Sequence, residues 1–116
     1  MAVLSFAKTD ADTVLLRNAI LRMIVSRAQK HAVDPADLKE LEVAKPMGAI
    51  SFDLLDNDQR ARLTEAVYQG TQDLKQEIAE GKATEEPVRA GIEEKLDEIL
   101  ALLSRFRDQD HESRQP

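Results

Sequence analysis

The 116-residue chain contains no cysteine, and this absence excludes several classes of chemistry. Without thiols there can be no disulfide framework, no thiolate nucleophile and no zinc site built on cysteine. Tryptophan is also absent, and phenylalanine and tyrosine together make up 3% of the residues. Hydrophobic residues nevertheless reach 42% of the chain, so we expect a core of aliphatic side chains packed between secondary structure elements.

Histidine is scarce as well, since only His31 and His111 are present. Neither follows a glutamate by three positions, as the histidines of di-iron helical bundles do. The segment from Gly81 to Thr84 lacks the adjacent Lys-Ser or Lys-Thr pair of a phosphate-binding loop, and no Gly-x-Ser-x-Gly nucleophile motif occurs. We therefore predict no catalytic residue, no metal site and no cofactor, and we do not expect an enzyme.

Long apolar runs are missing too, because the longest, Ile99–Leu103, is far shorter than a membrane span. The first residues lack the basic segment and long apolar stretch of a secretory signal. We therefore expect a cytoplasmic protein that does not enter the membrane. The formal net charge of −6 argues against nucleic acid as a partner, since phosphate backbones attract clustered Lys and Arg.

Helical periodicity is the strongest positive signal in the sequence. Apolar residues recur at spacings of three and four between capping residues and helix stops. The predicted helices span residues 10–31, 34–45, 56–80 and 86–107. We therefore predict an all-α fold, namely a small helical bundle of three longer helices plus one short connector helix.

The segments outside these helices are harder to assign. Residues 1–8 could form a first strand or a packed arm, and we expect a short N-terminal arm because no partner strand is evident. Residues 47–55 could likewise form a strand or a loop. Residues 1–107 would then be a single helical domain. Residues 108–116 are polar throughout, so we expect a disordered tail there.

Gly70 is unusual because it lies within the apolar stripe of the helix predicted over 56–80. A glycine inside a helix costs about 1 kcal/mol relative to alanine. A close approach of another backbone would offset that cost, so we expect tight helix packing at Gly70.

Two of the predicted helices indicate contact with a partner. The apolar residues of the first cover more than half of its circumference, which suits a central helix or a subunit interface, and the last carries a narrower stripe. We therefore predict a protein–protein interaction module, a small adaptor or regulator that forms a homodimer, with a heterologous protein as a further possible partner. The candidate interface residues are Leu16, Ile20, Ile24, Arg27, Leu96, Ile99, Leu103 and Phe106.

The first predicted helix also carries Arg17, Arg22 and Arg27, and no acidic residue lies among them. An arginine buried beside apolar neighbours needs a carboxylate or backbone carbonyls, unless its long stem carries the charged end past them to water. The expected suppliers of a carboxylate are residues of the last helix, namely Glu93, Glu94, Asp97 and Glu98. The alternative function is a regulator that binds a small anionic ligand or nucleic acid through arginines of the first helix.

Overall fold

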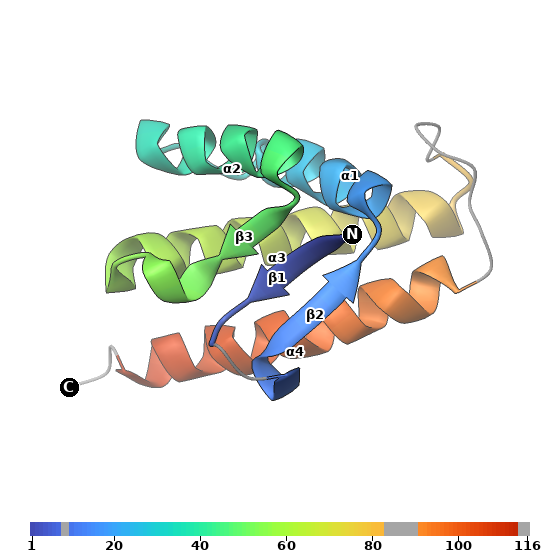
Figure 1. Ribbon diagram of the computed structural model, residues 1–116. Helices are drawn as coiled ribbons and strands as arrows, with labels where there is room; N and C mark the ends of the chain where they lie inside the picture. The colour runs from blue at the N-terminus through green and yellow to red at the C-terminus, as the bar shows by residue number, and fades with distance from the viewer. Residues whose placement is uncertain (8–9, 83–90, 114–116) are drawn as a thin grey trace.

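The computed structural model describes residues 1–7, 10–82 and 91–113. Within them the chain forms four α-helices and a three-stranded sheet (Figure 1). The prediction of an all-α bundle is therefore wrong. The three strands come from residues 1–8, where an arm is expected, from the start of the first predicted helix and from residues 47–55.

The sheet is mixed, with strand order β2-β1-β3. Strand β1 (Ala2–Ser5) lies in the centre, antiparallel to β2 (Thr13–Leu16) and parallel to β3 (Ala49–Ser51). Figure 1 shows the strands lying across α3 and α4, so that helices cover one face of the sheet. The side chains of the other face are exposed or half-buried.

The first predicted helix is in fact a strand followed by a shorter helix, α1 (Asn18–Ala28). Val14 and Leu16 point into the core, whereas Leu15 between them is 55% exposed. Buried and exposed side chains alternate over only four residues here, and such a short strand pattern directly before a helix is easily taken for the start of that helix. Pairing with β1 is what makes these residues a strand. The apolar arc looked too wide because it combined the residues of a strand with those of a helix.

Helix α2 (Pro35–Met47) begins where the sequence indicated. The side chain of Asp34 caps it by accepting a hydrogen bond from the Ala36 amide at 2.8 Å, and Pro35 occupies the first turn. The helix continues slightly beyond its predicted end, with Pro46 in its last turn, and stops at Gly48. Gly48 has a φ of 69°, a left-handed conformation that favours glycine, and leads the chain into β3.

Helices α3 (Asn57–Ala79) and α4 (Ile92–Ser113) lie side by side beneath the sheet (Figure 1). Asp56 caps α3 by accepting from the Gln59 amide at 2.8 Å. The beginning of the predicted last helix falls largely outside the described residues. Helix α4 extends past the expected end at 107, and the disorder of residues 108–116 stays a prediction. No helix in the described part of the chain is long and apolar enough to cross a membrane.

The core brings distant segments into close contact. A Cβ atom placed on Gly70 would lie 2.6 Å from the Ala28 backbone nitrogen, which confirms the expected tight packing, here of α3 against α1. The ring of Phe6 stacks between those of Phe52 and Phe106, with 4.2 Å between centroids on each side. This stack joins the residues that directly follow β1 and β3 to the second half of α4.

Candidate functional site

The residues predicted as an interface lie in or against the core of a single chain. Four of them are fully buried, namely Ile24, Leu96, Ile99 and Leu103. Three more are almost fully buried, namely Leu16, Ile20 and Arg27. Phe106 is half-buried and packs against the core. Most of these side chains are covered by other parts of the same chain, and the candidate interface stays a prediction. Leu16 and Ile20 also border a cavity, so a binding surface can include them only together with more exposed residues.

The buried arginine has a different partner from the one expected. Arg27 is 4% exposed, and its Nε lies 2.7 Å from Oε2 of Glu77 on α3, not beside an acid of α4. Its Nη1 also donates to the Met23 carbonyl at 2.9 Å. Arg27 is thus part of the internal structure, while Arg17 and Arg22 are exposed. Arg17 stands where β2 turns into α1.

Strand β2 has a free edge. The Val3 amide donates to the Gly48 carbonyl at 3.0 Å, so the backbone polar groups of Val3 point towards β3. Leu15 is the antiparallel partner of Val3. In such a ladder two opposite residues exchange both hydrogen bonds or neither, so the N–H and C=O of Leu15 point away from β1. Among the described residues, no further strand lies on that side.

Helix α4 forms a wall beside this edge. Residues spaced three and four apart bring one stripe of α4 towards β2, and two cavities lie between the stripe and the strand. The stripe consists of Lys95, Glu98, Leu102 and Arg105. We call the space between this stripe and Thr13–Leu16 the β2–α4 groove.

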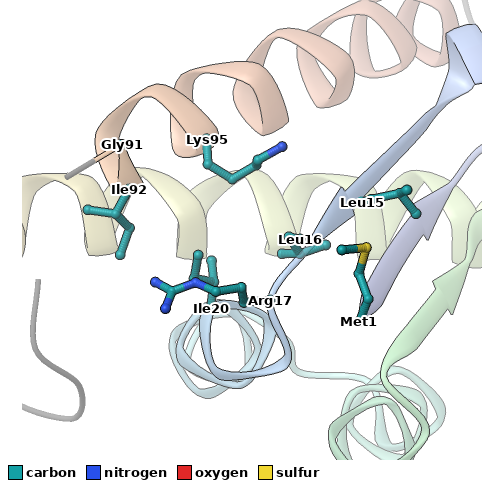
Figure 2. Close-up of a pocket in the computed structure, with 8 residues that line it drawn as sticks. All are labelled: Met1, Leu15, Leu16, Arg17, Ile20, Gly91, Ile92 and Lys95. Carbon is teal, nitrogen blue, oxygen red and sulfur yellow. The ribbon is translucent and has the colours of Figure 1, made fainter. Parts of the chain in front are cut away.

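The larger of the two cavities lies at the Leu16 end of the groove and has a volume of about 400 Å³. Leu16, Ile20 and Ile92 give it an apolar surface, and Met1 and Leu15 flank it (Figure 2). Lys95 on α4 and Arg17 at the β2–α1 junction border the cavity, and their charged ends point in opposite directions in Figure 2. The cavity therefore combines an apolar surface with two cationic side chains.

The two cations differ in their bonding. Lys95 donates from Nζ to Oε2 of Glu98 at 2.8 Å. Among the described residues, Arg17 makes no side-chain hydrogen bond or ion pair. The first turn of α1 also contains no acidic side chain, so the positive end of this helix is not neutralised there. A negatively charged group would therefore be attracted by Arg17 and by the N-terminus of α1, whereas the charge of Lys95 is already balanced by Glu98.

The other cavity, of about 270 Å³, lies at the Thr13 end of the groove. Arg105 borders it and is held in place by Asp12, whose Oδ1 lies 2.6 Å from Nη2, and by the Ala11 carbonyl. Leu102 provides an apolar wall. The groove thus has a cavity at each end, with the free edge of Leu15 between them.

A third cavity, of about 580 Å³, lies between the α1–α2 connection and α3, and its charges satisfy one another. Arg62 donates from Nε to the buried Asp37 at 2.8 Å, and this hydrogen bond raises the pKa of Arg62. Glu65, on the same wall, is held by Arg107. Because these groups are already paired, we regard this cavity as structural.

Sequence reasoning identified parts of the β2–α4 groove but not the groove itself. It singled out Leu16, Ile20 and Arg17 for other reasons, and it missed Leu15, Ile92 and Lys95 as site residues. The available signal was the alternation of buried and exposed positions over residues 13–16, which we assigned to a helix.

Comparison of the chain with protein-family models, with curated proteins and with solved structures gives no match. Within the described residues, no group of three or more His, Asp or Glu side chains is placed to hold a metal ion. The function proposed below therefore depends on the geometry of the groove alone.

Proposed function

We propose that the protein is a protein–protein interaction module that binds an extended segment of a partner chain as an additional strand beside β2. The observation that carries the proposal is the free edge at Leu15, flanked by a helical wall and ended by two cavities. In strand addition, backbone hydrogen bonds provide affinity, and pockets that accept alternate side chains provide specificity. The groove offers both.

A segment of another protein suits this edge better than a second copy of the chain. Strand β2 has four residues, and Met1 and Leu15 are the large exposed apolar side chains beside it. Stable interfaces bury about 1,200–2,000 Å² in total, which two short strands meeting edge to edge would not supply by themselves. An extended segment instead enters both cavities and contacts α4 along its length.

The test blocks the edge without breaking the sheet. In Leu15→Pro the strand loses an N–H that β1 does not use, and proline is tolerated on edge strands. We expect this variant to keep the helical circular dichroism spectrum and to bind at least about tenfold more weakly to peptides selected from a random display library. Leu15→Ala is the control, because it removes the side chain but keeps the N–H.

Amide exchange gives a second measure of the same contact. A bound strand would accept a hydrogen bond from the Leu15 amide and slow its hydrogen exchange. A library that yields no binding peptide, or selected peptides that bind Leu15→Pro as well as the unaltered protein, would refute the proposal.

A further inference from the structure

The cavity at the Leu16 end is where a strand added to β2 must stop. Strand β2 ends at Leu16, and after Arg17 the chain turns into α1, so no further edge exists for pairing. A longer segment would have to leave the groove across the two cations. A segment whose chain ends there would instead place its terminus in the cavity.

The positive charge at the cavity determines whether the N-terminus or the C-terminus of a bound segment fits there. Arg17 makes no ion pair among the described residues, so it would repel an α-ammonium group and attract an α-carboxylate. Lys95 is shared with Glu98 and would add to this attraction by turning its ammonium group from Glu98 to the ligand. A carboxylate at the Leu16 end also fixes the direction of the strand. The bound segment would run parallel to β2, with its last residue beside Arg17.

The apolar surface of the cavity indicates the side chain of that last residue. Leu16, Ile20 and Ile92 are all buried aliphatic residues. In an extended strand, neighbouring side chains point to opposite faces, so an internal acid and the residue next to it cannot enter one cavity together. A C-terminal residue carries its carboxylate and its side chain on the same Cα atom. It can therefore meet the cations and the apolar surface at once.

We propose that the cavity binds the free C-terminal residue of the partner segment, with its carboxylate held by Arg17 and Lys95. Its aliphatic side chain would pack on the buried residues of β2, α1 and α4. This inference rests on the proposed function, since it assumes a strand bound at β2. It names the partner by its chemistry, which is an extended C-terminal tail that ends in an aliphatic residue.

The simplest probe is N-acetyl-leucine, which carries the carboxylate, the side chain and one amide of such a tail. In ¹H–¹⁵N correlation spectra we expect saturable shifts of the amides of Leu16, Ile20 and Ile92. The primary amide N-acetyl-leucinamide should bind about tenfold more weakly, because the charge-assisted hydrogen bonds are lost. Equal affinity for the acid and the amide would overturn the inference, as would the absence of any shift at these residues.

Two variants and a matched control test whether Arg17 and Lys95 hold the carboxylate of the ligand. Arg17→Gln and Lys95→Gln should each weaken binding of the acid by about tenfold and leave binding of the amide unchanged. Arg22→Gln removes the same charge from an exposed position of α1 that does not line the cavity, so it should have little effect. A loss equally large in Arg22→Gln would mean that only the general charge of α1 matters, and would overturn the assignment.

Further probes separate this inference from the proposed function. The acid 4-methylpentanoate lacks the backbone amide, so it should bind more weakly than N-acetyl-leucine. Equal binding would show a site for small aliphatic acids in place of a strand terminus. Selected peptides that lose affinity on Leu15→Pro but not on amidation of their C-terminus would leave the groove function standing and refute the C-terminal assignment.

Discussion

At the scale of single residues, Gly70 shows how one missing side chain sets the distance between two helices. A Cβ atom there would lie 2.6 Å from the backbone nitrogen of Ala28 and 2.9 Å from the carbonyl oxygen of Ile24. Both obstacles are backbone atoms, which cannot move aside as the end of a flexible side chain can. The helices must separate to admit a methyl group.

We therefore expect Gly70→Ala to destabilise the fold, although alanine favours helices. The gain in helix propensity is about 1 kcal/mol, while forcing extra volume into a packed core costs about 1–3 kcal/mol and more where backbone must shift. Urea unfolding should show a net loss of stability. Gln72→Ala, on the exposed face of α3, is the control and should change the unfolding free energy by less than about 0.5 kcal/mol. A stabilised Gly70→Ala variant would mean that α1 and α3 lie further apart in solution.

The pair Arg27–Glu77 is asymmetric, and its two members should respond differently to mutation. Arg27 is 4% exposed, whereas the Glu77 side chain is 34% exposed and can be hydrated. Glu77→Leu removes the carboxylate that accepts from Nε and Nη2 of a buried guanidinium, and we expect it to lower the unfolding free energy by about 2–4 kcal/mol. Arg27→Met leaves the half-exposed carboxylate in contact with water, and its loss should be smaller.

A double-mutant cycle measures this coupling. The variant with both changes should recover much of the stability lost in Glu77→Leu, because the buried guanidinium that loses the Glu77 carboxylate is then absent too. Equal losses in the two single variants, measured by urea unfolding, would contradict the asymmetry.

At the scale of elements, the sequence predicted most helices but missed the strands. Helices α2 and α3 were predictable because Asp34, Pro35 and Asp56 are local signals that act within one turn. Strands β1 and β2 contain four residues each, and their hydrogen bonds depend on each other. No local signal distinguishes Val14 and Leu16 from the start of the helix that follows them.

The site was less predictable than the fold, for a related reason. The groove exists because Leu15 faces outward on an edge strand and α4 passes beside it, and both facts depend on tertiary packing. The wide apolar arc of the first predicted helix suggested an interface where the chain instead packs on itself. Arg17 could be named from the sequence as a cation without an acidic neighbour, but not as part of a cavity.

At the scale of the whole molecule, the homodimer stays a prediction, which sedimentation velocity can check directly. The structure changes what a mutation of the first helix should do. Ile24 has no exposed surface within one chain, so Ile24→Asp buries an unpaired charge in the core. We expect this variant to lose its cooperative thermal transition in circular dichroism. If the unaltered protein sediments as a dimer, a folded and monomeric Ile24→Asp protein would show instead that Ile24 belongs to the subunit interface.

The central position of β1 also has a consequence for the order of assembly during synthesis. The pairing of β1 with β2 joins neighbouring segments, whereas its pairing with β3 must wait until α1 and α2 have left the ribosome. Contacts between segments distant in sequence form slowly, because chain entropy is lost before they are made. Helix α4 follows last of all the described elements, and it supplies one wall of the groove. A nascent chain would therefore present the open edge of β2 before it has the wall that makes binding selective.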